Sequence, residues 1–313
     1  VTNDGPVQNG SGTITFVEDG GAESQNVYKT VNKEDLGNIV NSMYIAADKA
    51  YIVVNNSNKV VVANKNTMVK EAEISGDGII NPRFFVASNG KGYISNWGDP
   101  LNTEDDFIAV VSLESNAVLG KISVGEGPEK MLIAGDKLFV CLQGGFGNNN
   151  KIVVINTSDD AVESRLDVGD VPNSIVEDSK GDLWVLCGGK PAWTGEETPG
   201  YLYAIDGSTL ELSFLKFNST EHPSLLSEES DNLYFALDGK VFEMGTEENE
   251  LPSNALEGLD GFYYSLDAKN GFLYATDAGD FTSEGTLKVF NLVSGDLLQT
   301  ITAGIIPGQF VFP

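Results

Sequence analysis

The stretch KAYIVVNNSNKVVVAN, residues 49–64, decides how this chain folds, because two apolar runs flank one short polar link. Each run is nearly continuous and rich in β-branched and aromatic residues, a pattern typical of strands that are buried on both faces. The link NNSN has the composition of a tight turn. We therefore interpret residues 49–64 as a β-hairpin made of the two central strands of a sheet.

The same hairpin pattern returns along the chain at intervals of about 40 to 50 residues, the range expected of propeller-type repeats. Its first run recurs at 51–54, 93–95, 138–141, 183–186, 233–236 and 273–275, and its second run at 59–63, 107–112, 151–155, 201–205, 240–243 and 286–290. The regular spacing predicts a single repeat domain that spans residues 1–313.

Two further strands complete each repeat. Alternating stretches such as VLGKISVG (118–125) and VESRLDVG (162–169) follow the second run, and period-2 alternation predicts a half-exposed outer strand. A new apolar segment then begins at a proline, which suits the first residue of a strand and not its centre. These prolines are Pro82, Pro128, Pro172, Pro223 and Pro307.

Four strands in about 44 residues match the blade of a β-propeller. Six copies are nearly complete, and a seventh can be assembled from both chain ends: residues 307–312 as first strand, VTNDG (1–5) as the end of the second, 12–17 as the third and 25–31 as the fourth. The sequence thus predicts an all-β, seven-bladed β-propeller with four antiparallel strands per blade, closed by N- and C-terminal strands in one blade.

Charge excludes some partners. The chain has 19 Lys plus Arg and 46 Asp plus Glu, a net charge of −27, and such a surface repels nucleic acids and anionic lipids. No run approaches the ~18 apolar residues of a membrane-spanning helix, so no span is expected. Val1 is a poor natural start, which suggests a mature chain whose targeting segment has been removed.

Catalytic and metal-binding patterns are weak. The only histidine, His222, precedes a proline and is expected to be structural, so neither a His-rich metal site nor an HExxH motif can form. Cys141 and Cys187 are expected to be buried and unbridged. A calcium site near Asp277 or Asp280 stays open, although the EF-type spacing is absent. We expect no enzyme activity, no metal site and no cofactor.

The links between second and third strands differ in length, and insertions on one face of a repeat protein indicate a binding face. The link is short at 55–58 and around Asp238, but long at 96–106, 143–150, 187–200 and 277–285 and in the N-terminal copy at 3–12. The long links carry aromatic and amide side chains, and the segments that lead into first strands add more polar groups on the same side. The predicted ligand-binding residues are Asn3, Asn55, Arg83, Asn96, Trp97, Lys130, Gln143, Phe146, Asn173, Trp193, Tyr263, Asp277, Phe281 and Gln309. The alternative is that each aromatic ring only fills its own loop.

The strand-opening prolines, second strands such as KLFVCL and NLYFAL, and third strands that end in IN or ID resemble YncE-type and surface-layer-type seven-bladed propellers. The N-terminal NDG…NGSGTITFV and the following NKEDLGNIVNSMYI are similar to secreted propeller lipoproteins of gut Bacteroidetes, including BtuG-type proteins. That resemblance implies a lipid-anchored protein of the outer-membrane cell surface. It also implies capture of a corrinoid (cobalamin) or similar large nutrient and its handover to an outer-membrane transporter.

Two other function classes compete with ligand capture. One is a protein–protein or glycan interaction propeller without catalytic activity. The other is an enzyme such as a quinone-dependent dehydrogenase, but the three tryptophans Trp97, Trp184 and Trp193 are too few for a tryptophan docking pattern in every blade.

Overall fold

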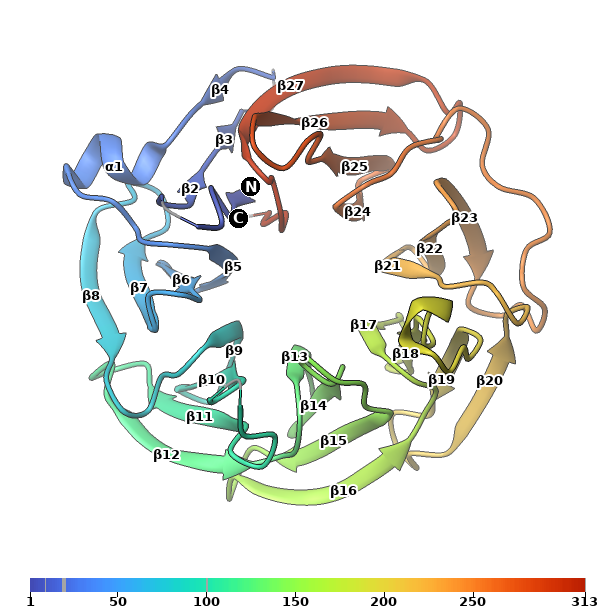
Figure 1. Cartoon of the computed structure of the whole chain (residues 1–313), viewed down its shortest axis with the longest axis horizontal. Helices are drawn as coiled ribbons and strands as arrows, with labels where there is room; N and C mark the ends of the chain where they lie inside the picture. The colour runs from blue at the N-terminus through green and yellow to red at the C-terminus, as the bar shows by residue number, and fades with distance from the viewer. Residues whose placement is uncertain (9, 19–20, 100, 313) are drawn as a thin grey trace.

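Antiparallel sheets are arranged around a central axis in the computed structural model, which describes residues 1–8, 10–18, 21–99 and 101–312 (Figure 1). Asn9 and Pro100, which fall within two of the predicted long links, lie outside the described residues. The hairpin at 49–64 forms as predicted, with Lys49 opposite Asn64 and Val54 opposite Lys59. Residues 50–54 are all buried, as expected for a strand covered on both faces.

Five sheets have four strands in sequence order from the axis outward. Their strands are β5 (Val40–Ala46), β6 (Lys49–Val54), β7 (Lys59–Asn64) and β8 (Lys70–Ser75); β9 (Pro82–Ser88), β10 (Lys91–Asn96), β11 (Phe107–Ser112) and β12 (Val118–Ser123); β13 (Pro128–Ala134), β14 (Lys137–Leu142), β15 (Lys151–Asn156) and β16 (Ala161–Asp167); β17 (Pro172–Glu177), β18 (Leu183–Cys187), β19 (Tyr201–Ile205) and β20 (Leu212–Lys216); and β24 (Ser265–Lys269), β25 (Phe272–Asp277), β26 (Glu284–Asn291) and β27 (Leu297–Ile305).

A sixth sheet has only three strands, β21 (Ser224–Glu229), β22 (Asn232–Leu237) and β23 (Lys240–Gly245). The next segment, TEENELPSNALEG (246–258), is acidic and contains a proline, so it lacks the alternating pattern of an outer strand. It bonds the backbone of β23 at two points, from the Leu256 amide to the Val241 carbonyl at 2.8 Å and from the Glu248 amide to the Gly245 carbonyl at 3.0 Å.

The prediction of seven four-stranded blades is wrong, because six sheets of three or four strands form in the described ranges. The N-terminal region instead has two short two-stranded ladders, β1 (Thr2–Asn3) with β2 (Thr13–Ile14) and β3 (Phe16–Val17) with β4 (Glu23–Ser24).

The expected fourth strand at 25–31 is replaced by the helix α1 (Val27–Asn32). Tyr28 is buried and its hydroxyl donates to Glu34, while Val27 packs against the same apolar cluster. Apolar residues at 27, 28 and 31 share one helical face, so the segment has helical periodicity and not the period-2 pattern of a strand.

The two chain ends meet and close the ring (Figure 1). They do not form the predicted four-stranded blade, because residues 308–312 are not a strand and residues 12–17 divide between two short ladders. Asn3 forms an isolated antiparallel bridge with Pro307, and the Thr2 amide donates to the Gln309 carbonyl at 3.0 Å. The Asp4 amide donates to the Ile306 carbonyl at 2.9 Å. The last residues of the chain thus pair with the first.

The core lies between neighbouring sheets. Tyr93 and Ile108 of one sheet share an apolar cluster with Met131 and Val153 of the next. The same face-to-face packing recurs around the ring, so each sheet buries its faces only because it has neighbours. Cys141 and Cys187 are buried within this core and are not bridged.

Candidate ligand-binding face

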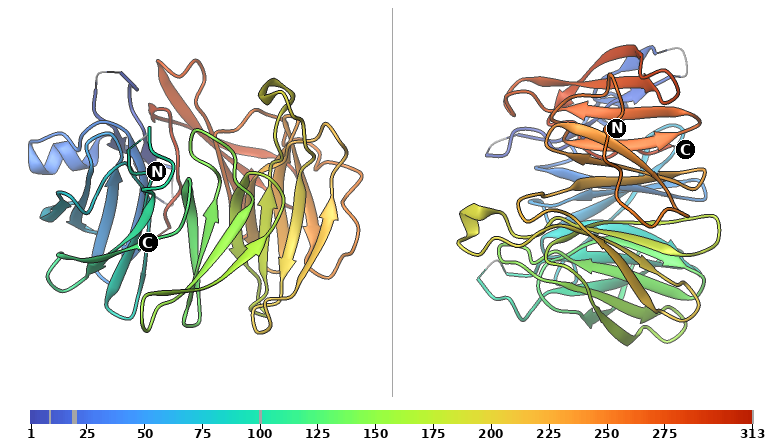
Figure 2. Two further views of the ribbon diagram at one scale, coloured as in Figure 1. Left: turned by 60° about the horizontal axis from the view of Figure 1, so that its bottom comes forward. Right: turned by 90° about the vertical axis from the view of Figure 1, so that its right-hand side faces the viewer.

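The links between second and third strands and the segments that lead into inner strands share one side of the ring, here called the connector face. Backbone hydrogen bonds join the two sets: the Asn55 amide donates to the Ile39 carbonyl, and the Gln143 amide to the Gly127 carbonyl, both at 2.8 Å. The 3-10 helix η1 (Ala192–Thr194) projects on this side (Figure 2). The predicted grouping of the long links is therefore confirmed.

A backbone irregularity recurs where the inner strands begin. The register of β5 against β6 shifts between Val40 and Ser42, and that of β17 against β18 shifts between Pro172 and Ser174. Matching bulges occur at the start of β9 and β13. A bulge redirects the side chain of its extra residue. The residues at these bulges include Asn41, Arg83, Lys130 and Asn173, three of which belong to the predicted binding set.

Four of these inner strands begin with a proline or valine, and the residue just before each has a left-handed backbone conformation. Its φ is 59° at Ile39, 50° at Asn81, 70° at Gly127 and 59° at Val171. Ile306, before the C-terminal segment, has φ of 54°. Such values are genuine outliers for β-branched residues. The repeated geometry positions the first side chains of each inner strand at the connector face.

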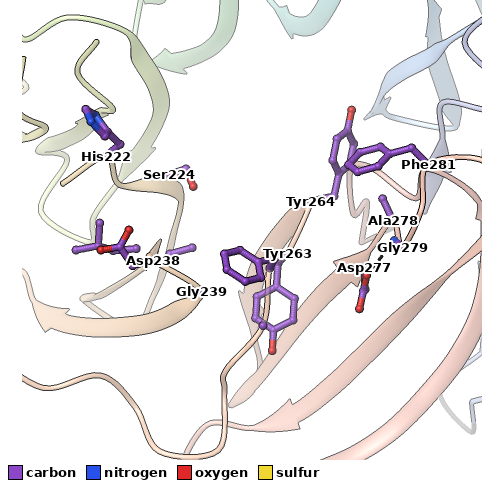
Figure 3. A pocket seen from close by; sticks show the side chains of 14 residues that line it. His222, Ser224, Asp238, Gly239, Tyr263, Tyr264, Asp277, Ala278, Gly279 and Phe281 are labelled. Carbon is purple, nitrogen blue, oxygen red and sulfur yellow. Dashed lines mark hydrogen bonds between the residues drawn. The ribbon is translucent and has the colours of Figure 1, made fainter. Parts of the chain in front are cut away.

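A pocket on this face has a volume of about 410 Å³ and lies between the β21–β23 and β24–β27 sheets. Figure 3 shows His222, Ser224 and Asp238 on one side and Tyr264 and Phe281 on the other. Three aromatic rings of the pocket remain exposed to solvent: Phe262 (86%), Phe281 (53%) and Tyr264 (41%). Exposed rings that gather at one concave site indicate a binding surface more strongly than scattered ones do.

Tyr264 links the pocket to the ring closure. Its hydroxyl donates to the Asp4 carboxylate at 2.9 Å, and its ring meets Phe281 edge-on with centroids 6.0 Å apart. Burial raises the pKa of Asp4 to about 6, although the Tyr264 hydrogen bond and the charge of Arg83 act in the opposite direction. The aromatic wall is thereby held by Asp4 of the N-terminal segment, whose backbone amide in turn bonds the Ile306 carbonyl near the C-terminus.

The predicted residue Tyr263 also lines this pocket, but its hydroxyl is occupied elsewhere, since it donates to the Asp260 carbonyl at 3.0 Å. The predicted residues Asp277 and Phe281 line the pocket as well. The Asp277 carboxylate accepts the Gly279 amide and pairs with Lys288 at 3.1 Å, and these contacts lower its pKa. The structure therefore brings three of the predicted residues together here.

A second group of predicted residues meets at the start of β9. The Arg83 guanidinium lies 4.3 Å from the centroid of the Trp97 ring, and its Nε donates to Glu129 at 2.9 Å. Phe146, which is 77% exposed, packs edge-on against Trp97 with centroids 5.5 Å apart. Burial raises the pKa of Glu129 despite the opposing charge of Arg83. This group therefore combines one exposed aromatic ring, Phe146, with the Arg83–Glu129 ion pair.

Between Trp97 and Phe146 lies a cavity of only about 30 Å³, which also contains the buried carboxyl group of Asp106. The Gly127 amide donates to Asp106 Oδ2 at 2.6 Å. Burial, followed by smaller contributions from Asp105 and Glu126, raises the pKa of Asp106 to about 7. A cavity of this size suits water and not an organic ligand.

Three predicted amides are structural, since Asn3, Asn55 and Asn96 are buried. The Asn3 side chain bonds Thr13, Thr15 and the Gly304 amide, all at 3.0 Å. The amides of Asn55 and Asn96 bond backbone groups of neighbouring segments. These three residues lie at the strand ends where the sequence predicted them. Their side chains, however, bond the protein framework and do not point toward a ligand.

The remaining predicted residues are spread around the face. Asn173 donates to the Pro223 carbonyl at 3.0 Å, and Gln309 accepts the Met43 amide at 2.8 Å. Lys130 is partly exposed on β13, where burial lowers its pKa, and Gln143 lies half-buried after β14. Trp193 is 85% exposed on η1, outside the aromatic pocket. The predicted set therefore forms two clusters and several separate contacts.

The sequence interpretation missed Phe262 and Tyr264, two of the three exposed rings of the pocket. Tyr264 lies immediately before β24, one residue after the Tyr263 that we predicted. The signal was present as three consecutive aromatic residues, FYY at 262–264, in a polar loop. No group of three or more metal-ligating side chains occurs in the described ranges, and the Asp280 carboxylate bonds the Thr282 and Ser283 amides of its own loop.

A family model described as "Domain of unknown function (DUF5074)" matches residues 1–301. The chain belongs to the DUF5074 family. No curated protein matches this DUF5074 chain.

Solved structures resemble the DUF5074 chain in fold. The computationally designed Ika8 protein is 12% identical, with a TM-score of 0.64, and the match covers 88% of this chain and 79% of that one. Apo AztD from Citrobacter koseri is 11% identical, with a TM-score of 0.57 and coverage of 92% and 76%. The extracellular domain of BT4673 from B. thetaiotaomicron is 15% identical, with a TM-score of 0.57, and covers 76% of this chain but 32% of that one.

Identities this low establish the propeller-like fold and nothing about ligands. They leave the YncE-type and BtuG-type resemblance as an interpretation of the sequence. Neither α1 nor any other described helix of this DUF5074 chain has the length and apolar content needed to span a bilayer.

Proposed function

We propose that this DUF5074 chain is a non-catalytic binding protein that captures an organic ligand in the aromatic pocket on its connector face. The observation that carries the proposal is the exposure of Phe262, Tyr264 and Phe281 at one concave site of about 410 Å³. Pockets of 300–1,000 Å³ with aromatic walls and few polar groups are typical of small-molecule sites. Each exposed ring offers a large apolar area that a ligand would cover.

The pocket is supported by a rigid frame. Its residues come from the ends of neighbouring sheets, and Tyr264 is held by Asp4 of the opposite chain end. A preorganised site loses little conformational entropy when a ligand binds. This architecture favours capture over catalysis, since no paired nucleophile and general base stands out among the described pocket residues.

The specific candidate ligand is a corrinoid, from the resemblance to BtuG-type capture proteins. A corrinoid is larger than the pocket and would lie across the connector face with one edge against Phe262 and Phe281. The burial of the Asn3, Asn55 and Asn96 amides removes part of the amide rim that first favoured this ligand. The aromatic pocket is the remaining support for it.

The same resemblance implies a location on the outer-membrane cell surface, where the protein would pass its ligand to a transporter. The likeness to the extracellular domain of BT4673 agrees with a secreted or surface location. The net charge of −27 would keep such a protein soluble and away from anionic lipid headgroups.

The test is a titration of the protein with cyanocobalamin, followed by its visible spectrum and by co-migration on gel filtration. We expect saturable binding that weakens about tenfold in Phe262→Ala, since loss of a ring contact worth ~1.4 kcal/mol changes affinity by that factor. Trp193→Ala, equally exposed but outside the pocket, is the matched control and is expected to bind normally. No spectral change and no co-migration at micromolar protein would reject the corrinoid.

A second candidate is a protein- or glycan-binding propeller. It is favoured by the rings of Trp193 and Phe146, which lie outside the pocket and are exposed on two long links. Binding on a glycan array or to a co-purified surface protein that is lost in Trp193→Ala, but retained in Phe262→Ala, would select this function over the pocket.

A further inference from the structure

The aromatic pocket has an electrostatic character that its shape alone does not reveal. Two carboxylates, Asp238 and Asp277, line it together with the rings of Phe262, Tyr263, Tyr264 and Phe281. Lys288 of β26 pairs with Asp277 at 3.1 Å, and the charge of Arg83 acts on Tyr264. Asp238 forms no ion pair within the described ranges, so an acidic group remains unneutralised beside the rings.

Aromatic faces attract cations because their π-electrons carry negative charge, and such rings grouped in a cage bind quaternary ammonium groups. The pocket already contains one example of this contact, since the Lys288 ammonium lies 5.9 Å from the centroid of the Tyr263 ring. The whole chain, with a net charge of −27, attracts cations and repels anions on approach.

Neutral aromatic ligands would gain only the stacking and apolar contacts of the pocket. A cationic ligand would gain those contacts together with the attraction of the rings and of Asp238 and Asp277. The hydrogen bond from the Gly279 amide and the Lys288 ion pair lower the pKa of Asp277, so this carboxyl group is ionised near neutral pH. The negative charge of Asp277 is therefore present before any ligand binds.

We propose that the pocket between the β21–β23 and β24–β27 sheets selects an organic cation, such as a quaternary ammonium group, over a neutral molecule of the same shape. This inference rests on the proposed function, because it assigns a ligand class to the same pocket. Phe262 and Phe281 supply the exposed rings, and Asp238 supplies a carboxylate that no ion pair in the described ranges neutralises.

The experiment compares choline with its neutral isostere 3,3-dimethylbutan-1-ol by ligand-observed NMR on the full chain, at low ionic strength. We expect saturable choline binding and at least about fivefold weaker binding of the alcohol, a factor that one cation–π contact can supply. Equal binding of the two molecules, or no choline binding up to ~50 mM, overturns the proposal.

Three variants locate the effect. Phe262→Leu is expected to weaken choline binding about fivefold, and Phe262→Tyr to retain it, because Tyr keeps the aromatic face. Trp193→Leu is the matched control, since this ring is as exposed as Phe262 but lies outside the pocket. Unchanged choline binding in Phe262→Leu, or equal losses in Phe262→Leu and Trp193→Leu, would contradict the assignment.

A fourth variant is expected to strengthen choline binding. Lys288→Met removes the resident cation, which frees Asp277 and the Tyr263 ring, so choline is expected to bind more tightly. Weaker choline binding in Lys288→Met would count against the proposal. Cyanocobalamin binding that depends on Phe262, without any preference for choline, would overturn the cation selectivity while leaving the proposed capture function in place.

Discussion

Two carboxyl groups, one buried and one half-buried, mark the connector face of this protein. Asp106 lies under the Trp97–Phe146 pair and Asp4 under Tyr264, and burial raises the pKa of both. Neither carboxyl group forms an ion pair within the described ranges. Each therefore carries a cost when it ionises, and that cost makes the stability of the connector face depend on pH.

We predict that Asp106→Asn raises the stability of the fold at neutral pH. The folded-state pKa of about 7 exceeds the unfolded value, so the contribution of Asp106 to stability is largest at low pH and is lost as the pH rises from about 4 to 7. Asparagine keeps an oxygen that accepts the Gly127 amide but does not ionise. The gain above pH 7 should be about 1–2 kcal/mol, less than the full shift implies, because water screens the site.

The measurement is urea unfolding of both proteins between pH 4 and 8. The difference between variant and wild type should grow with pH up to 7 and then remain constant. Glu104→Gln, an exposed change in the same link, is the control and should show no such slope. A pH-independent difference for Asp106→Asn would show that the carboxyl group is already ionised in the fold.

The start of each inner strand is the element that shapes the face. The same three features recur in neighbouring sheets: a residue with left-handed backbone conformation, then a proline or valine, then a bulge. The left-handed residues are Ile39, Asn81, Gly127 and Val171. Glycine and asparagine tolerate this conformation, whereas β-branched residues are strained in it. The backbone geometry is thus imposed by the ring and not by the local residue preference.

Val171→Asn should therefore stabilise the protein by about 1 kcal/mol, through relief of strain at φ of 59°. The backbone hydrogen bonds of residue 171, to the Asn149 carbonyl and from the Gly188 amide, do not involve its side chain and remain. Thermal unfolding gives the measurement. Val293→Asn, an exposed site without positive φ, should have almost no effect, and a larger loss at position 171 than at 293 would contradict the strain argument.

Closure of the ring involves the whole molecule, because the first and last residues pair only when every sheet between them is in place. Phe310 is 6% exposed and packs with Leu287, Val289 and Ile301 of the last sheet. Deletion of residues 306–313 would remove this contact and the backbone partners of Thr2 and Asp4. We expect such a truncation to unfold at a markedly lower temperature.

A single substitution tests the same closure. Phe310→Ala should cost about 3–5 kcal/mol in urea unfolding, the usual penalty for truncating a buried phenylalanine. Phe312→Ala changes the same kind of residue two positions later, where the ring is 37% exposed, and should cost less than about 1 kcal/mol. Similar losses at both positions would mean that the C-terminal segment does not fasten the ring.

Much of the fold followed from local pattern. The runs at 49–64 predicted a hairpin, which formed, and the prolines marked the inner strands β9, β13 and β17. The count of blades failed at the N-terminus and after β23, where helical periodicity and an acidic, proline-containing segment replaced the alternation of a strand. Hydrophobic periodicity is a local property of the sequence. It predicts a blade strand only where the alternating pattern of the other repeats is present.

The candidate site was only partly predictable, because its side chains are oriented by contacts between distant segments. The amino-acid order alone placed Asn3, Asn55 and Trp97 on the connector side, since strand alternation and link length determine which end of a sheet a residue occupies. Ring closure and the inner-strand bulges then decided that the Asn3 and Asn55 amides serve the backbone and that Tyr264 reaches Asp4. A one-residue offset reverses the direction of a side chain, and that offset is decided by the neighbouring sheets, which no local pattern contains.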